Sequence, residues 1–257
     1  MKRSRIPLIA TILVLLFLYL PIMILVINSF NESRFGGVWT GFSLKWYEKL
    51  FQERAIWKAV KNSLVVGLSA TVVSTVMGTI AAFGLYRYKS RIQQLQYALI
   101  YSPLVIPDIL MGMSLLLFFV ISKIPLSLLT IFIAHTTFCV SYVTMVVWSK
   151  LQNFDFAVIE AAQDLGACWG TIARRILAPL LAPGIISGAL LAFTMSLDDY
   201  IVSSFVAGPG STTLPIYVYG MIKFGSTPLI NALSTILLVV TFALAWITQH
   251  LTKGETL

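Results

Sequence analysis

Charged side chains are scarce in this sequence of 257 residues: Asp, Glu, Lys and Arg together make up only 11% of it. A water-soluble domain usually has about 25% charged residues. Half of that charge cannot cover the surface of a globule of this length, and 58% of the residues are hydrophobic. The composition argues against a water-soluble enzyme, a disordered chain or a coiled coil, and it indicates an integral membrane protein.

Cysteine, histidine and catalytic motifs are also sparse. The two cysteines, Cys139 and Cys168, lie far apart, and neither they nor His135 and His250 have the spacing of a metal site or a disulfide framework. The sequence contains no GxxxxGK[ST] phosphate-binding loop, no GxSxG and no HExxH. We therefore expect a chain without catalytic activity of its own and without a bound metal.

Six apolar stretches approach or exceed the about 20 residues that a membrane-spanning helix needs. They cover residues 7–27, 59–86, 95–121, 126–148, 180–205 and 229–251. Six spans place both termini on one side of the membrane. The basic tail with Lys2, Arg3 and Arg5 and the basic turn 87–91 indicate that this side is the cytoplasm.

The predicted organisation is all-α, with three segments. Residues 1–58 hold the first span and an aromatic-rich outer segment, residues 59–251 form a core of five helices, and residues 252–257 are a short cytoplasmic tail. The net charge of +8 then belongs to basic flanks beside anionic lipid, and no nucleic-acid surface is implied.

Two of the expected spans carry a small side chain at every fourth position. The stripes are Ala70, Ser74, Gly78 and Ala82 in one span, and Gly184, Gly188, Ala192 and Ser196 in the other. Residues four apart share one helix face, and small side chains let helices approach closely in lipid. The stripes fit packing inside the chain, contact with a partner subunit or the lining of a path.

Asp108 lies inside the expected third span. Pro103 and Pro107 precede it and remove two helical N–H donors, which leaves the carbonyls of Leu99 and Pro103 without their usual partners. Such broken backbone is tolerated at membrane depth only against protein or a water-filled space. An intramembrane acid costs about 2.5–3.5 kcal/mol on insertion scales, which favours a role in a polar path. A protonated structural aspartate is the alternative.

Asp198 and Asp199 lie next to each other near the outer end of the expected fifth span. No basic residue is close to them in sequence, so they predict an uncompensated negative site that an external cation would satisfy. Ser196 and Asp199 share the helix face of the small-residue stripe, whereas Asp198 points about 100° away. The alternative is that both acids only mark the helix end at the lipid headgroups.

Aromatic residues gather in the outer segment 30–57, where most of them are expected to form an interfacial belt. Trp46 and Tyr47 are candidates for the mouth of the path, because an aromatic face attracts an ammonium group by a cation–π contact. Tyr19, two residues before Pro21 in the first span, is a similar candidate.

The longest inner loop, residues 151–178, is predicted to form an amphipathic helix, a turn and a second short helix. Its apolar positions on one helical face are Phe154, Val158, Ala161 and Leu165. Gly166 follows them at the position where a helix commonly ends in left-handed geometry. The second helix is expected over 171–177, before Pro179. A segment of this kind would lie in the membrane interface or dock onto a soluble partner.

The same loop contains a longer spaced pattern. It reads Glu160-Ala161-Ala162, three residues, Gly166, nine residues, and Ile176-Leu177-Ala178-Pro179. The pattern resembles the EAA loop of ABC importer permeases, with Ala178 in place of the usual leucine. The resemblance implies the six-helix type I importer permease fold, with this cytoplasmic coupling loop between helices 4 and 5.

The expected roles within the coupling loop differ from residue to residue. Ala161 and Ala162 are expected to pack, Gly166 to form the tight turn, and Glu160 and Asp164 to make polar or charged contacts. The ATPase would dock onto this loop from the cytoplasm.

Further positions are similar to one branch of that family, the spermidine/putrescine permeases of the C type. They include 21–22, 28–31, 34–35, 46–47, 102–108 and 196–199. The resemblance implies a multi-pass subunit of the bacterial inner membrane that pairs with a sister permease. Two cytoplasmic ATPase subunits, which bind ATP and Mg, and a periplasmic polyamine-binding protein are the other implied partners. No cofactor is expected on this chain itself.

Two other functions fit parts of the pattern. A permease of the same family could carry ferric iron, thiamine or an oxyanion, but an oxyanion favours basic or helix N-terminal groups at depth, and Asp108 is acidic. A secondary transporter would need no ATPase, but such carriers often contain inverted repeats, and the two halves of this sequence show no similarity.

Overall fold

The computed structural model describes residues 6–33, 38–87, 91–152, 154–155, 157–223 and 228–252. Helices account for most of these ranges, in which the only β-type pairing is an isolated bridge between Asn31 and Phe42. The all-α prediction is confirmed. Several residues used above lie outside the described part: Lys2, Arg3, Arg5, Arg34, Phe35, Lys89 and most of the predicted cytoplasmic tail.

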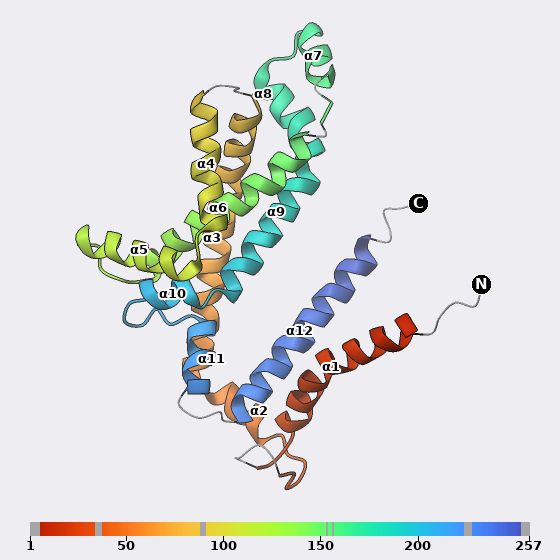
Figure 1. Ribbon diagram of the computed structural model, residues 1–257, viewed down its shortest axis with the longest axis vertical. Coiled ribbons are helices and arrows are strands. Elements are labelled where there is room, and N and C mark those ends of the chain that lie inside the picture. Colours follow the sequence, from red (N-terminus) through yellow and green to blue (C-terminus); the bar gives the residue numbers. More distant parts are fainter. Residues whose placement is uncertain are drawn as a thin grey trace. The chain divides into compact units, whose positions relative to one another are not determined.

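The chain divides into two compact units, residues 58–217 and residues 1–57 with 218–257. In chain order the described helices are α1 (Ile6–Ser29), α2 (Lys45–Gln52), α3 (Arg54–Arg87), α4 (Arg91–Val105), α5 (Asp108–Ile121), α6 (Leu128–Gln152), α7 (Ala157–Asp164), α8 (Trp169–Ile172), the π-helical turn η1 (Ala173–Leu177), α9 (Ala178–Asp198), α10 (Ile201–Val206), α11 (Leu214–Lys223) and α12 (Pro228–Thr252) (Figure 1). The boundaries of the two units fall within α3 and α11. The sequence-based division assigns residues 218–251 to the core that begins at residue 59. In the structure, contacts between residues instead group 218–257 with residues 1–57. The segment boundaries at 58 and 251 stay a prediction.

Four described helical stretches are long and apolar enough to cross a membrane. They are Pro7–Ser29, Arg54–Tyr86, Leu128–Gln152 and Trp169–Asp198. The bent pair α4 and α5 would make a fifth, and Pro228–Ala243 within α12 is a shorter apolar helix. Every predicted span therefore falls on helical structure, whereas the count of six crossings stays a prediction.

The break that Pro103 and Pro107 predict in the third span is confirmed. α4 ends at Val105 and α5 begins at Asp108, and the two helices are bent by 111°. The Ser102 hydroxyl donates to the Leu99 carbonyl at 2.9 Å, so a side chain bonds one of the acceptors that the prolines leave free. The two prolines thus end one helix and place an acid at the first position of the next.

The predicted fifth span differs from the structure at both ends. The short helix expected over 171–177 is not separate, because α8, η1 and α9 run on continuously to Asp198. Pro179 lacks an N–H and its ring crowds the carbonyl four residues earlier, and the wider π-helical turn directly before it fits this disruption. At the other end the helix stops at Asp198, and residues 201–206 form the separate helix α10.

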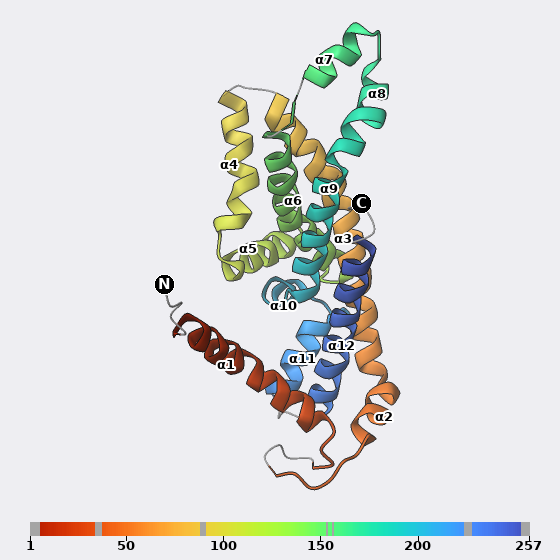
Figure 2. The same cartoon turned by 90° about the vertical axis from the view of Figure 1, so that its right-hand side faces the viewer.

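α6 is the central helix of the unit formed by residues 58–217, and 56% of its most apolar stretch is buried. α4, α9 and α10 pack against it (Figures 1 and 2). A Cβ added at Gly78 would lie 2.8 Å from Val143 Cβ, and one added at Gly188 would lie 3.4 Å from Val143 Cα. Both small-residue stripes therefore bring α3 and α9 close to α6, which identifies them as packing surfaces within the chain.

In the other unit, α12 packs against α1 and α2. Trp46 is 6% exposed and donates from Nε1 to the Asn31 carbonyl at 2.9 Å. The Tyr47 hydroxyl and Ser29 Oγ are hydrogen bonded at 2.7 Å. These contacts fasten α2 to the end of α1, whose most apolar stretch has no buried residue within the chain and is free to face lipid or a partner.

Candidate functional site

The three predicted acids line one pocket within the unit formed by residues 58–217. Asp108, Asp198 and Asp199 border a space of about 360 Å³ between α4, α5, α6, α9 and α10. They come from positions 90 residues apart in sequence, and the break after Pro103 and the turn after α9 bring them together. The structure thus brings the three acids together, and their part in transport stays a prediction.

Asp108 is exposed at the first position of α5. The positive end of the helix dipole favours a carboxylate there. Within the described part of the chain, Asp108 has no hydrogen-bond or ion-pair partner. Its carboxylate is therefore free to bind a cation that enters the pocket.

Asp198 is the last residue of α9 and is also exposed. The carboxyl end of a helix carries a partial negative charge, so the dipole opposes an acid at this position. Among the described residues, Asp198 has no hydrogen-bond or ion-pair partner. It is the acid of the pocket whose charge the chain compensates least.

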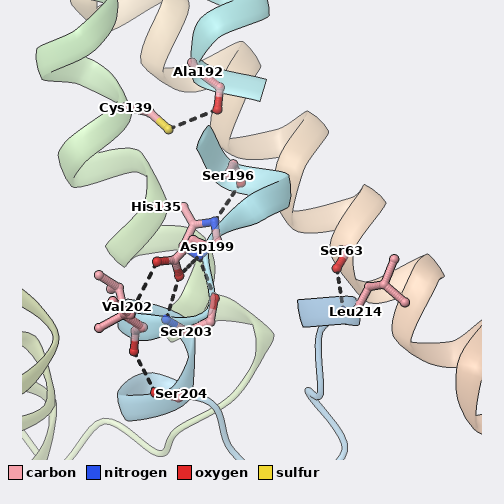
Figure 3. A network of polar contacts seen from close by, with 11 residues as sticks. Ser63, His135, Cys139, Ala192, Ser196, Asp199, Val202, Ser203, Ser204 and Leu214 are labelled. Carbon is pink, nitrogen blue, oxygen red and sulfur yellow. Dashed lines mark hydrogen bonds and ion pairs between the residues drawn. The ribbon is translucent and has the colours of Figure 1, made fainter. Parts of the chain in front are cut away.

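Asp199, the next residue, instead has three polar partners: the backbone N–H groups of Val202 and Ser203 and the side chain of His135 (Figure 3). Its Oδ1 accepts from the Val202 N–H at 3.2 Å, and its Oδ2 accepts from the Ser203 N–H at 2.7 Å. The same Oδ2 lies 3.2 Å from Nε2 of His135 on α6. The prediction of an uncompensated pair of acids is therefore wrong for Asp199, because its partner His135 is distant in sequence and adjacent in space.

His135 connects three helices and was not a candidate from the sequence. Its side chain is 1% exposed, with Nδ1 2.6 Å from Ser196 Oγ and Nε2 2.8 Å from Ser203 Oγ. Because a carboxylate only accepts, the contact with Asp199 requires a hydrogen on Nε2, which Asp199 shares with the nearer Ser203 oxygen. In that neutral tautomer the Ser196 hydroxyl donates to Nδ1. The one available signal was a lone polar ring inside a predicted span, which is costly unless it is bonded.

The far end of α10 is anchored to the start of α6. Thr130 Oγ1 donates to the Val206 carbonyl at 2.7 Å. Gly208, two residues after Val206, lies so close to the backbone of Leu126 that an added Cβ would overlap the Leu126 carbonyl. Ser211 Oγ accepts from the Gly208 N–H at 2.7 Å and closes the turn. α10 is thus held at both ends, which fixes the wall of the pocket that it forms.

The aromatic lining of the pocket differs from the prediction. The pocket is bordered by Phe138, Tyr142 and Tyr200, none of which was a candidate from the sequence. Trp46 and Tyr19 belong to the other unit. Tyr19 is 54% exposed on α1, while Trp46 is buried, and a role of either in transport stays a prediction.

The ring of Trp46 already lies beside cations of its own chain. The Lys45 ammonium is 5.1 Å from the ring centroid and that of Lys49 is 6.0 Å away. Two lysines of this chain therefore already lie within cation–π distance of the ring, and a contact of Trp46 with the cargo stays a prediction. Among the described residues, no three His, Cys, Asp or Glu side chains group as a metal site.

The predicted coupling loop forms α7, a glycine turn and α8, and it projects beyond the ends of α4 and α6 (Figures 1 and 2). Gly166 has φ +79°, as the helix-ending turn requires. Its N–H donates to the Gln163 carbonyl at 2.8 Å, and the next N–H, of Ala167, donates to the Ala162 carbonyl at 3.0 Å. The tight turn expected at Gly166 is confirmed.

Within the chain, α7 packs through residues outside the apolar face that the periodicity defines. Ile159 and Ala162 are buried, whereas Val158, Ala161 and Leu165 are exposed, Leu165 at 89%. Ala162 therefore packs within the chain, whereas the packing role expected of Ala161 stays a prediction. The apolar face deduced from the periodicity exists, but it points outward.

The polar residues of the loop lie at its surface. Glu160 and Asp164 are exposed on α7, as polar contacts with a partner would require. Cys168 is exposed as well, and its Sγ lies 3.3 Å from Thr171 Oγ1. The hydrogen bond with Thr171 lowers the pKa of the Cys168 thiol.

Comparison with known proteins agrees with this architecture. Residues 74–255 match the family described as binding-protein-dependent transport system inner membrane component. The chain is 43% identical over 237 residues to the spermidine/putrescine transport system permease protein PotC of Haemophilus influenzae, covering 92% of each. It is 44% identical over 229 residues to the putrescine transport system permease protein PotI of Escherichia coli, covering 86% of this chain and 82% of the relative.

A solved structure shows the same fold at low sequence identity. A bacterial ABC transporter involved in the import of the acidic polysaccharide alginate aligns with a TM-score of 0.74 and 15% identity, covering 100% of this chain and 99% of that one. The chain is thus a multi-pass inner-membrane protein with the fold of ABC importer permeases. Because the family match spans most of its length, this chain belongs to the binding-protein-dependent transport system inner membrane components.

Proposed function

We propose that this chain is a membrane-spanning permease subunit of an ATP-driven importer of polyamines, of which spermidine and putrescine are the expected cargo. The observation that carries the proposal is the pocket in which the unpartnered acids Asp108 and Asp198 face aromatic side chains. The relatives PotC and PotI, whose names specify spermidine and putrescine transport, support the same cargo.

The pocket suits the chemistry of a polyamine. Such a molecule is a flexible chain of ammonium groups joined by methylenes, so it needs spaced carboxylates and apolar or aromatic walls. Asp108 and Asp198 supply the carboxylates, and Phe138, Tyr142 and Tyr200 supply the walls. Because both acids are exposed, each attraction is modest, which permits release of the cargo further along the path.

Neutralising the free acids tests the cargo assignment. Asp198→Asn or Asp108→Asn is expected to lower spermidine uptake about tenfold, because a charge-assisted contact with an ammonium is lost. The measurement is ATP-driven uptake of radiolabelled spermidine into proteoliposomes holding the complete transporter and its binding protein. Glu48→Gln, which neutralises an exposed acid of α2 outside the pocket, is the matched control.

Two outcomes would contradict the assignment. Full uptake by the Asp108→Asn/Asp198→Asn double variant would show that these acids do not bind the cargo during transport. If excess thiamine or sulfate inhibited uptake of labelled spermidine and excess putrescine did not, the cargo would be the inhibiting compound and not a polyamine.

We further propose that the chain pairs with a sister permease, each forming half of the path, and that both termini are cytoplasmic. Two ATPase subunits would bind the coupling loops from that side. The outward apolar face of Val158, Ala161 and Leu165, beside the exposed acids Glu160 and Asp164, supports a docking role. A periplasmic binding protein would deliver the cargo from the other side.

Cys168 allows docking to be measured without introducing a label site. Cys139 is fully buried and Cys168 is exposed, with a lowered pKa that increases its reactive thiolate form at neutral pH. We expect a maleimide to label Cys168 alone, and docked ATPase to slow this labelling. Cys168→Ser should abolish the signal and Cys139→Ser should not. Labelling that is equally fast with and without ATPase would place the docking surface elsewhere.

A further inference from the structure

We propose that the two adjacent aspartates have different roles: Asp198 binds the cationic cargo, whereas Asp199 is fixed by His135 as a positioning group at the junction of α6, α9 and α10. The inference rests on the proposed function and deepens it. It adds His135, Ser196 and Ser203 as residues that act through Asp199 instead of contacting the cargo.

The two acids differ in their position relative to a helix end. Asp198 is the last residue of α9, where the helix dipole opposes a negative charge. Asp199 precedes α10 and accepts the N–H groups of Val202 and Ser203, so its charge is stabilised by the start of a helix. One peptide bond therefore separates a disfavoured carboxylate from a favoured one.

The two acids also differ in the number of their hydrogen-bond and ion-pair partners. The carboxylate of Asp199, whose side chain is 10% exposed, already accepts two backbone N–H groups and the Nε2–H of His135. An ammonium group that bound it strongly would have to compete with these contacts. The exposed Asp198 has no partner in the described part of the chain. The cargo is expected to bind where the charge is unsatisfied.

His135 also joins the helices at the junction, which Figure 3 shows from close by. From α6, His135 reaches Ser196 on α9 with Nδ1 and Ser203 on α10 with Nε2. These contacts join the helices on either side of the turn that contains Asp198 and Asp199. Loss of the ring would leave a buried carboxylate and two hydroxyls short of a partner and would release this turn.

The test separates cargo binding from positioning in the complete transporter. Asp198→Asn is expected to weaken equilibrium binding of radiolabelled spermidine about tenfold, because it removes a charged contact, while the thermal midpoint of the complex stays unchanged. Asp199→Asn and His135→Phe are expected to lower the thermal midpoint and to reduce uptake about tenfold, with spermidine binding changed less than about twofold.

Two comparisons make the role of His135 specific. His135→Gln keeps an N–H near the position of Nε2 and should recover most of the uptake that His135→Phe loses. The double variant His135→Phe/Asp199→Asn should be no worse than the more damaged single variant, because residues of one network are not additive. Ser203→Ala should lower uptake and the thermal midpoint less than His135→Phe does. Ser204→Ala is the matched control, because the Ser204 hydroxyl donates to the Ile201 carbonyl, outside the network of His135.

The outcomes are distinguishable. If Asp199→Asn weakens spermidine binding as much as Asp198→Asn and leaves the thermal midpoint unchanged, the division of roles is wrong. If the wild-type complex neither binds nor imports spermidine, the proposed function fails, while the thermal midpoints still report on the junction. Should His135→Phe not assemble, the Ser203→Ala and Ser204→Ala pair and the two Asn variants decide the question.

Discussion

Replacing Gly208 with alanine is expected to prevent formation of a stable permease. The added Cβ would overlap the backbone carbonyl of Leu126, and no side-chain rotation can relieve a clash with backbone. Overpacking of a rigid site costs about 1–3 kcal/mol or more, and here the cost falls on the turn that holds α10 against α6. We expect little monodisperse protein after extraction into detergent, a lowered thermal midpoint and uptake at background level.

Gly84→Ala is the matched control for this substitution. Gly84 lies within α3, and nothing in the structure is within 4 Å of a Cβ added there. Alanine is the better helix former, so this variant should be at least as stable as the wild type. If Gly208→Ala instead matched Gly84→Ala in yield and thermal midpoint, the close approach to Leu126 would be wrong.

The second large effect is expected at the coupling loop. Gly166→Asp should leave insertion into the membrane intact but reduce ATP-driven uptake by about tenfold to a hundredfold. Gly166 has φ +79°, where residues with a side chain pay about 1–3 kcal/mol, so the turn after α7 would be reshaped. Glu160→Lys should have the same direction of effect by reversing a charge on the exposed surface of α7.

Gly166→Asn separates the added charge from backbone strain, because asparagine has nearly the shape of aspartate and, like it, adopts positive φ more readily than most residues. We expect it to retain clearly more uptake than Gly166→Asp. The measurement compares ATPase activity with uptake in the same proteoliposomes, since uncoupling lowers uptake more than hydrolysis. Full coupled uptake by Gly166→Asp, with wild-type amounts of bound ATPase, would contradict a coupling role for the loop.

The helical content and the break in the third span were predictable because their causes are local. A scarcity of charge together with long apolar runs requires helices in lipid, where backbone groups need internal partners. Two prolines four residues apart remove N–H donors wherever they occur, so the bend between α4 and α5 follows from Pro103 and Pro107 alone. The left-handed turn at Gly166 was predictable for the same reason.

Packing directions were less predictable, since they depend on what lies opposite a helix. The periodicity of the coupling loop defines an apolar face on α7, yet it does not say whether that face meets this chain or another. In the structure Ile159 and Ala162 face inward, and Leu165 is exposed. The small-residue stripes left a similar choice open, and the close approach of α3 and α9 to Val143 resolved it.

The scarcity of charge was sufficient to predict a membrane protein, and it also drew attention to the few acids within apolar sequence. That selection identified Asp108, Asp198 and Asp199, which line one pocket. Only the tertiary structure decided which of these charges is free, because a hydrogen bond depends on distance in space. His135, 64 residues before Asp199, bonds it at 3.2 Å and leaves Asp198 without a partner in the described chain.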